Sequence, residues 1–526
     1  MAIAFDSSAP GHKGVPGHED DLREGDDRPV ELTLPPSHRS SVDDETIRLS
    51  IRMVDESGIV GRLGTWKEAE RRGPGGRPET FPTRALLVGL MACVLTNQPL
   101  HLSRITEILF SQLSPACRKQ LGLPEPPAAD DRQAWEALYR NVRTRFHGML
   151  ALVDPSATPK NRRFDDDTFD RLTAKRRAEL TEAEWGERYD RLEWLINALI
   201  EASIRLLPRD VRRAFAGSVG VDGTLVRGHS RPYIRKRGTK LKKGRKPEIE
   251  MHSVDPDAGF YVRQSDERDA GVDASTGRDK IAWGYEATFA VSGAATPDED
   301  GLFPNLILGM TVLDQPGRSV GRHGAQVLAG LAARDYPAGF LAADRAFSSA
   351  KAEEFQLPAL ALGYRPVYDY KIDQLGVQDQ VDGFLQIEGD WYCPSIPEPL
   401  REATRDYRNH VVDEDTYRQR LSERWKYVAR PKGKPDAEGH VRLQCPAAGS
   451  WPMARCPLKP ASMIRDTLGR LHIPVAGDLA AAPPKSCTQQ SVTVPPTAGA
   501  KSIRSWSSRA PSGSSPTTRC ATPTKA

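Results

Sequence analysis

The sequence predicts an α/β protein in which an all-helical region precedes a mixed sheet flanked by helices, and a small cysteine-bearing insertion follows the sheet. The prediction depends on apolar spacing, which is helical before Gly217 and becomes strand-like after it. The strand-like runs are residues 218–226, 284–291, 302–313, 339–343 and 364–370, and the helix-like runs among them are 324–334 and 350–362. Three strands, a helix, a strand, a helix and a strand in this order form a mixed sheet covered by helices.

Length and composition limit the functional classes. A chain of 526 residues is long enough for two to four domains. The net charge is only +4, so a nucleic-acid surface requires local clustering of Lys and Arg. The first residues lack the basic and apolar parts of a signal peptide, and the longest apolar run, Ala85 to Leu95, is too short to span a bilayer. We therefore expect a cytoplasmic protein without membrane contact. Seven cysteines, an odd number in a large cytosolic chain, argue against a disulfide framework.

Composition divides the chain into five segments. Residues 1–42 are rich in Gly, Pro and His and predict a disordered leader. Residues 43–216 predict a helical region for DNA binding or dimerisation, and residues 217–375 predict the α/β core. Residues 376–490 predict an insertion domain, and residues 491–526 predict a disordered tail.

The helical region contains a candidate helix-turn-helix. Thr83 is placed to cap a helix through Leu95, which the run Asn97-Gln98-Pro99 ends. Ser103 is placed to cap a second helix. Any helical bundle contains such pairs, so DNA reading and simple packing both stay open. A later helix that stops at Pro208 has one apolar face and is better explained as part of a core: Leu192, Leu195, Ile196, Leu199 and Leu206.

Two strand-like segments end on an aspartate. Asp222 follows the apolar run Ser218 to Val221, and Asp344 follows Gly339 to Ala343. Such an aspartate is often only a turn former or helix cap. Here, however, the order of the intervening segments predicts that both lie together at the carboxyl ends of strands, where open α/β sheets bind ligands. Two adjacent carboxylates repel each other unless a cation lies between them, and Mg²⁺ prefers oxygen ligands. Asp222 and Asp344 are thus candidate ligands of a two-metal phosphoryl-transfer site.

A dense basic run begins close to Asp222. Tyr233, Gly238 and Gly244 interrupt it, but acidic residues do not, as they would in an ordinary solvated surface. We expect contacts with a phosphate backbone, with a solvated loop as the alternative. Its members are Arg227, Arg231, Arg235, Lys236, Arg237, Lys240, Lys242, Lys243, Arg245 and Lys246.

Three motifs together resemble the DDE transposases of bacterial insertion sequences. They are Val221-Asp222-Gly223-Thr224, Lys280 with Trp283-Gly284-Tyr285, and Ala343-Asp344-Arg345-Ala346-Phe347, and the resemblance covers about residues 45 to 500. It implies a ribonuclease-H-like core in which two aspartates and a glutamate bind Mg²⁺ and catalyse strand cleavage and transfer at the inverted repeats of a mobile element. Asp222 and Asp344 match the two aspartates. Arg345 matches a position that contacts phosphate or braces the loop. The implied partners are element ends and target DNA, bound by a homodimer.

Four cysteines lie in the expected insertion. Three precede a proline, which predicts tight turns: Cys393, Cys445 and Cys456, with Cys487 as the fourth. Four thiolates suit a structural Zn²⁺ site, although no C-x-x-C pair is present. Buried or unpaired thiols are the alternative.

The third carboxylate of the resemblance is missing from its expected place. No Asp or Glu follows Asp478, where about six would be expected over that length. Codons can be chosen for Ser502 to Lys525 so that a shifted frame encodes DQELVFASPEWKLTYHTLRNTNE, which resembles the transposase segment with the catalytic glutamate. We therefore expect a frameshift that truncates the enzyme and impairs it. A natural disordered tail is the alternative, and Glu353, Glu354 and Glu414 are then candidates for the third ligand.

These observations leave three functional hypotheses. The first is a DDE transposase. The second is a non-catalytic, DNA-binding remnant of one, and the third is a related metal nuclease that cuts without strand transfer.

Overall fold

The structure is a computed structural model that describes residues 41–71, 73, 81–156, 162–228, 230–236, 248–263, 280–294, 302–368, 375–464 and 469–500. For Val262, Arg263, Lys280 and Arg345 it describes the backbone only. Nearly all of the expected leader, most of the basic run and residues 501–526 of the expected tail lie outside these residues. Within them, no helix is long and apolar enough to cross a membrane.

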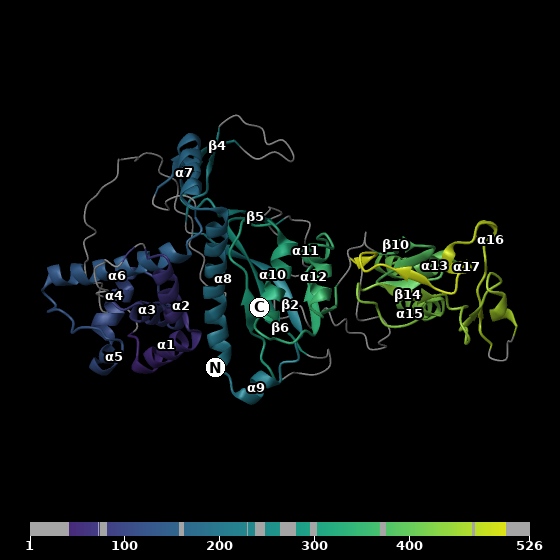
Figure 1. Cartoon of the computed structure of the whole chain (residues 1–526), viewed down its shortest axis with the longest axis horizontal. Coiled ribbons are helices and arrows are strands. Elements are labelled where there is room, and N and C mark those ends of the chain that lie inside the picture. Colours follow the sequence, from purple (N-terminus) through teal and green to yellow (C-terminus); the bar gives the residue numbers. More distant parts are fainter. Residues whose placement is uncertain are drawn as a thin grey trace.

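The described residues form three separate hydrophobic cores. One draws on residues 42–153, the next on residues 204–368 and the last on residues 384–494, with partly buried side chains packed around each. Figure 1 shows the helices of the first core beside the central sheet, and the small strands and helices of the last core beyond α12. The whole chain is mixed α/β, as predicted.

The first core is a bundle of helices. Its first helix shows how the sequence specifies it, because the Asp43 carboxylate accepts the Thr46 N–H (2.8 Å) at the start and Gly58 adopts a left-handed φ of 68° at the end. The helices are α1 (Asp44–Ser57), α2 (Ile59–Ala69), α3 (Thr83–Leu95), α4 (Leu102–Glu107), a π-helical continuation (Ile108–Gln112), α5 (Pro115–Gln120) and α6 (Arg132–Val153).

The expected helix-turn-helix pair is largely buried. Thr83 and Ser103 lie inside α3 and α4 rather than at their caps, which are Pro82 and His101. The two helices pack closely, because a Cβ at Gly89 would lie 2.7 Å from the Ile105 side chain. Along α4 and its continuation, only Ser103 and Ser111 are exposed. A recognition helix needs an exposed face to reach bases, so the pair favours packing over DNA reading.

Helix α8 (Glu182–Arg205) joins the first two cores. Its apolar face packs Leu192 and Leu195 against the helical core and Ile200 and Ile204 into the core of the sheet, which confirms that this face is part of a core. Its start is fixed by a capping box between Thr181 and Glu184.

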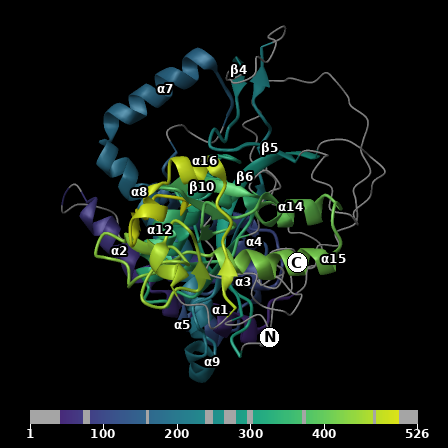
Figure 2. The ribbon, with the colours of Figure 1, turned by 90° about the vertical axis from the view of Figure 1, so that its right-hand side faces the viewer.

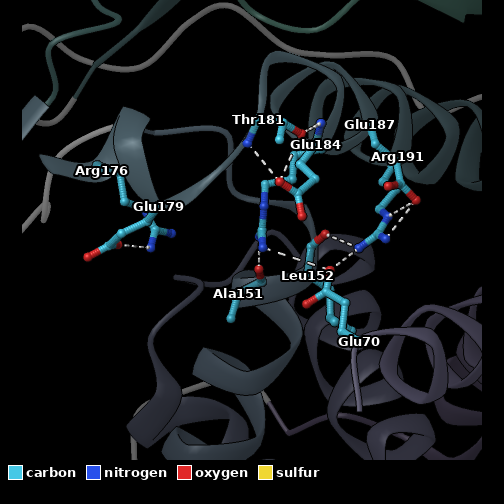
Figure 3. A network of polar contacts seen from close by, with 10 residues as sticks. Glu70, Ala151, Leu152, Arg176, Glu179, Thr181, Glu184, Glu187 and Arg191 are labelled. Carbon is cyan, nitrogen blue, oxygen red and sulfur yellow. Dashed lines mark hydrogen bonds and ion pairs between the residues drawn. The ribbon is translucent and has the colours of Figure 1, made fainter. Parts of the chain in front are cut away.

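Arg191 of α8 ties three helices together. Its guanidinium donates to the Leu152 carbonyl at the end of α6 (3.1 Å), to the Glu187 carboxylate (2.7 Å) and to the Glu70 carboxylate beyond α2. Figure 3 shows these partners converging on Arg191. The short helix α9 (Arg209–Arg213) then leads into the sheet.

The central sheet has the strand order β5-β6-β2-β8-β9, with β7 paired to β6. Strand β6 runs antiparallel to β2, β5 and β7, whereas β8 runs parallel to both β2 and β9. The strands are β2 (Val219–Arg227), β5 (Gly259–Arg263), β6 (Lys280–Ser292), β7 (Ile307–Met310), β8 (Phe340–Ala343) and β9 (Arg365–Pro366). Helix α10 (Val320–Ala332) connects β7 to β8, while α11 (Arg345–Ser348) and α12 (Gln356–Ala361) connect β8 to β9.

Several predicted elements have different bounds. The helix expected at 350–362 is only α12, because Pro358 is tolerated in the first turn of a helix but not in its interior. The strand expected at 302–313 shortens to β7, and that expected at 364–370 shortens to β9, with residues 369 and 370 outside the described part. Strand β5 was missed, because its five residues show no clear alternation.

A small sheet with the order β1-β4-β3 stands apart from the central one. Its strands are β1 (Phe164–Asp165), β3 (Ile234–Arg235) and β4 (Ile249–His252). Helix α7 (Asp166–Glu179) is held against it, because the Phe169 and His252 rings stack at 3.7 Å and His252 Nε2 lies 2.8 Å from the Asp166 carboxylate. Figures 1 and 2 both show α7 and β4 at the top of the molecule.

The last core contains short strands and helices around a buried ion pair. Arg424 (3% exposed) donates to both carboxylate oxygens of Glu388 at 3.2 and 2.8 Å. The elements are β10 (Val377–Val381), β11 (Phe384–Ile387), β12 (Asp390–Tyr392), α13 (Glu398–Arg401), α14 (Ala403–Arg408), α15 (Glu414–Arg424), β13 (Arg430–Pro431), β14 (Val441–Gln444), β15 (Ala454–Arg455), β16 (Leu471–His472), α16 (Gly477–Ala481), α17 (Lys485–Thr488) and β17 (Val492–Val494).

The insertion extends beyond its expected end at residue 490. Strand β17 pairs with β14, and Val492, Val494 and Ala500 are buried. Residues 491–500 are therefore part of this folded unit rather than of a disordered tail. Val492 and Val494 alternate with Thr493, as in a half-buried strand. The prediction that ended the insertion at residue 490 did not take this alternation into account.

Candidate metal centre and basic segment

The structure brings Asp222 and Asp344 to neighbouring positions of the sheet. Strands β2 and β8 pair in parallel, with Val221 opposite Ala343. Asp222 and Asp344 each come directly after this last pair, and Asp344 is the first residue after β8. Two aspartates 122 residues apart in the sequence therefore have neighbouring backbone positions where β8 ends beside β2.

Each aspartate also has a defined local role. Asp222 is half-buried, and its Oδ1 accepts the Gly223 N–H at 2.8 Å. Asp344 is exposed, and its carbonyl accepts the N–H groups of Phe347 (3.0 Å) and Ser348 (3.2 Å), which begins α11. Their carboxylate oxygens are the donors that Mg²⁺ prefers. A divalent cation shared by these two aspartates stays a prediction.

The Asp222 face is not the face that α10 covers. The side chains of Val219 and Val221 pack with Leu328 of α10, and Asp222 alternates with them along β2. On the Asp222 face lie Val226 and Ile281, two apolar side chains that remain 37% and 63% exposed. These exposed side chains lie towards the carboxyl end of β2, whereas Ala287, on the same face and nearer Asp222, is fully buried.

No third ligand joins the pair in the described part of the chain. Within that part, no third His, Cys, Asp or Glu completes a group with Asp222 and Asp344 in which all ligand atoms lie within 4.8 Å. Of the alternative acids, Glu354 pairs with Arg322 of α10 (3.3 Å), on the opposite face of the sheet, and Glu353 precedes it. Glu414 lies in α15 of the insertion, where it pairs with Arg418 at 2.6 Å.

The basic run starts at the end of β2 and crosses to the small sheet. Arg227, Arg231, Arg235 and Lys236 are exposed, as a phosphate-binding segment requires. The remaining candidates lie outside the described residues: Arg237, Lys240, Lys242, Lys243, Arg245 and Lys246. The side chain of Arg345, at the start of α11, is not described either.

An aromatic cluster anchors the described end of the basic run. The rings of Tyr233, Phe260 and Trp283 contact one another at centroid distances of 5.0 to 5.7 Å, and the Arg235 guanidinium lies over Tyr233 and Phe260. Trp283 Nε1 donates to Ser230 Oγ at 3.0 Å. The cluster links the basic run to the hairpin of β5 and β6. Sequence analysis noted Tyr233 only as an interruption of the basic run and missed this role.

The motif Trp283-Gly284-Tyr285 has a structural explanation. Gly284 faces Arg227 across the β2–β6 ladder, and the Tyr285 hydroxyl donates to the Asp255 carboxylate. Burial raises the pKa of Tyr285 far above its usual value, and the Asp255 carboxylate raises it further, so this hydroxyl stays a hydrogen-bond donor. Sequence analysis also missed Asp255.

The four cysteines predicted as zinc ligands are buried in one core region. Cys393, Cys445, Cys456 and Cys487 are each at most 4% exposed, and all are free thiols. The Cys393 thiol donates to the Cys445 sulfur, which raises the pKa of Cys393 and lowers that of Cys445 to about 7.

One further group of side chains has ligand atoms at metal-binding distances. Asp436, Glu438 and His440 hold these atoms within 4.8 Å of one another on an exposed turn. The spacing of two residues between them was visible in the sequence. The Asp436 carboxylate already accepts the His440 N–H at 2.7 Å, which explains the turn without a metal.

Comparisons with known proteins add no relative. No family model matches the chain, and searches of curated proteins and of solved structures found no match either.

Proposed function

We propose that this chain is a DNA transposase of the DDE type, which cleaves DNA strands at the terminal inverted repeats of an insertion sequence and transfers them to a target. The observation that carries the proposal is that Asp222 and Asp344 directly follow the last residue pair of the β2–β8 ladder, although 122 residues separate them in the sequence. If each aspartate served only to form a turn or to cap a helix, nothing would require the two to lie at neighbouring strands.

The strand arrangement supports a ribonuclease-H-like core as the finer description of the fold. Three antiparallel strands, β2, β6 and β7, are followed by α10; then β8 adds in parallel beside β2, and β9 adds in parallel beside β8. The strand β5 is an additional member at the edge of the sheet. In this arrangement β2 and β8, the strands that Asp222 lies on and Asp344 follows, are side by side, which supports a site shared by the two acids.

In the proposed mechanism, Asp222 and Asp344 would hold Mg²⁺. When bound, the metal would activate a water or a 3′-hydroxyl as the nucleophile and stabilise the leaving oxygen. The protein itself fixes the two carboxylates through the β2–β8 register. The exposed basic residues that follow β2 neutralise phosphates and so position the strand without reading its sequence.

A non-catalytic remnant is the second candidate, and one observation favours it. In the described residues no third acid joins Asp222 and Asp344, and the sequence contains no Asp or Glu after Asp478. With two carboxylates, cation binding is weakened, and such a protein would hold DNA without cutting it. The proposed frameshift after Ala500 accounts for the loss.

The test compares this chain with a version whose reading frame is restored after residue 501. Both are incubated with Mg²⁺ or Mn²⁺ and with duplexes taken from the DNA that flanks the gene. We expect cleavage by the restored protein. Asp222→Asn and Asp344→Asn should each lower the rate by more than about 100-fold, because a catalytic unit fails when any member is lost.

Asp335→Asn is the matched control. Asp335 is exposed and lies in the left-handed region (φ 62°), which asparagine tolerates, and it precedes β8, whereas Asp344 follows that strand. Full activity of the Asp222 and Asp344 variants would contradict the proposal. Cleavage by the restored protein alone would assign this chain to the remnant class. Pre-cut ends that are never joined to a target would point to a nuclease instead.

A further inference from the structure

The four buried cysteines of the insertion come together from four separate turns. Cys393, Cys445 and Cys456 are each the first residue after a strand, namely β12, β14 and β15, and Cys487 lies on α17. Strand ends that meet at one edge bring residues distant in the sequence together. Figure 1 shows these elements within the one small domain on the right.

The cysteine sulfurs interact with one another. Cys393 and Cys445 share a hydrogen bond, and electrostatic interactions connect Cys445 with Cys456 and with Cys487. All four are at most 4% exposed, and three of them belong to the same hydrophobic core. Buried cysteines that served only as small apolar residues would have no reason to lie in one region of the domain.

Backbone donors aim at three of these sulfurs. Cys393 accepts the N–H of Ser395, Cys445 that of Ala447, and Cys456 that of Leu458. In each case the donor is two residues further on, and a proline that fixes φ stands between them: Pro394, Pro446 and Pro457. A thiol is a weak acceptor, whereas a thiolate is a strong one, so this repeated turn stabilises the metal-binding form.

Other contacts hold the turns in place. The Cys393 N–H donates to the Tyr427 carbonyl (2.9 Å), and the Cys456 N–H donates to Ser462 Oγ (2.9 Å), which is itself buried. The Cys487 segment is tied to the turn between β10 and β11, because the Ser486 N–H donates to the Asp382 carbonyl (3.0 Å). Three of the four ligand positions are therefore held by contacts of their own.

Positive charge lies beside the cluster. Lys459 is only 8% exposed, and its charge and that of Arg430 act on Cys445. The Lys459 ammonium donates to the Gln489 carbonyl, which offsets part of the cost of burying the charge. A Zn²⁺ ion with four thiolates carries a net charge of −2, which these two cations offset.

We propose that Cys393, Cys445, Cys456 and Cys487 bind one structural Zn²⁺ ion that holds the insertion domain together. Four sulfur donors without an open position are typical of structural zinc. Binding replaces four thiol protons, which pass to solvent, by four Zn–S bonds. The inference concerns the insertion domain alone and does not depend on the transposase proposal.

Binding must also tighten the cluster. Among the described residues, no three of these sulfurs lie within 4.8 Å of one another, whereas sulfurs of a tetrahedral zinc centre are about 3.8 Å apart. Cys393 and Cys445 are already in contact, so the turns of Cys456 and Cys487 must approach them. Zinc therefore acts as a clamp on these two turns.

The test uses the purified full-length chain. Metal analysis by mass spectrometry should find about one zinc per chain. Co²⁺ exchanged into the same chain should give the visible absorption and the near-ultraviolet sulfur charge transfer of a tetrahedral thiolate centre. Chelator treatment should lower the melting temperature and expose four additional thiols to a thiol reagent.

Cys445→Ser should lose the zinc, while Cys93→Ser should retain it. Cys93 is a matched control because it is equally buried, in α3 of the first core. If Cys445→Ser does not fold, the metal content and the Co²⁺ spectrum of the wild-type chain still show whether the cysteines bind zinc. Zinc-free protein with all thiols reactive would overturn the proposal. So would iron in place of zinc, a Cys393–Cys445 disulfide, or zinc retained by Cys445→Ser.

Discussion

Gly284 marks the closest approach between β6 and β2, next to the strand that carries Asp222. A Cβ at this position would lie 2.1 Å from the Val226 carbonyl oxygen and 2.9 Å from the Gly228 nitrogen. Both are backbone atoms, which cannot turn aside as a side chain can. The residue is therefore glycine because only glycine permits this ladder.

Gly284→Ala should destabilise the central core by about 1–3 kcal/mol, the usual cost of forcing extra atoms into a packed site. Gly330→Ala is the comparison, because a Cβ there meets nothing within 4 Å on α10. That change should stabilise by about 0.5–1 kcal/mol, since alanine favours the helix. Urea unfolding measures both. Equal free energies of unfolding for the two variants would show that β2 and β6 can separate at Gly284 and accommodate a Cβ without cost.

For single residues, the sequence predicted which side chains belong to the candidate site better than it predicted their hydrogen-bond partners. Asp222 and Asp344 could be located because each ends an apolar run, a local signal. The partners of Trp283 and Tyr285 could not, because Ser230 and Asp255 are 53 and 30 residues away. Hydrogen bonds over such separations leave no trace in local spacing. The absence of a third acid beside the pair likewise required the structure of the described residues.

Among the elements, α8 is the one that both cores share, and its polar face is also partly buried. Glu193 lies half-buried on this helix, and its carboxylate accepts a hydrogen bond from the Gln326 side chain of α10. Burial raises the pKa of Glu193 to about 7, and the nearby Asp190 raises it further. Gln326, the Val312 N–H and Arg334 oppose this shift by favouring the charged form.

The raised pKa predicts a loss of stability with rising pH. In the unfolded chain Glu193 loses its proton near the ordinary value of 4.5, and in the folded chain near 7. Between these values the folded state binds the proton more tightly, so its advantage is full below about pH 4.5 and disappears as pH rises through 7. Glu193→Gln, which stays neutral, should therefore be more stable than wild type at pH 8.

Denaturant midpoints at pH 5 and pH 8 measure this effect. Glu182→Gln controls for the loss of one negative charge on the same helix, because Glu182 is exposed in its first turn. For each variant, the change in the denaturant midpoint between pH 5 and pH 8 is compared. This change should be smaller for Glu193→Gln than for Glu182→Gln. If both variants show the same pH dependence of stability, titratable groups other than Glu193 cause the loss of stability at high pH.

Elements were predictable where apolar runs were long, and pairing was predictable only in part. Strand β6 was expected at 284–291 and spans Lys280–Ser292, close to the prediction. Its pairing with β5 could not be foreseen, because β5 itself was missed. The strand β17 was assigned to the tail, since three residues at the end of a domain carry little periodicity. Short strands exist mainly because a neighbour pairs with them, which spacing along one chain does not report.

At the scale of the whole molecule, charge is nearly balanced but unevenly distributed. The net charge is +4, yet ten Lys and Arg residues fall between Arg227 and Lys246 without an acid among them. Phosphate contacts by such a segment release counterions, so DNA affinity must fall as salt rises. The slope of log affinity against log salt concentration is proportional to the number of phosphate contacts. A variant that removes a contact should therefore change this slope, which shows where DNA binds.

Replacing Lys242 and Lys243 together by alanine should weaken DNA binding at every sequence and flatten the log–log salt slope by roughly 2, about 0.9 per lost contact. The matched control is the double change Lys432→Ala and Lys434→Ala, which removes the same charge from two exposed positions of the insertion. Fluorescence anisotropy across a salt series measures both. An equal loss in the two double variants would mean that DNA responds only to total charge. An unchanged slope for the first would remove the basic run from the interface, and the search for the DNA surface would then move to α7 and the helical core.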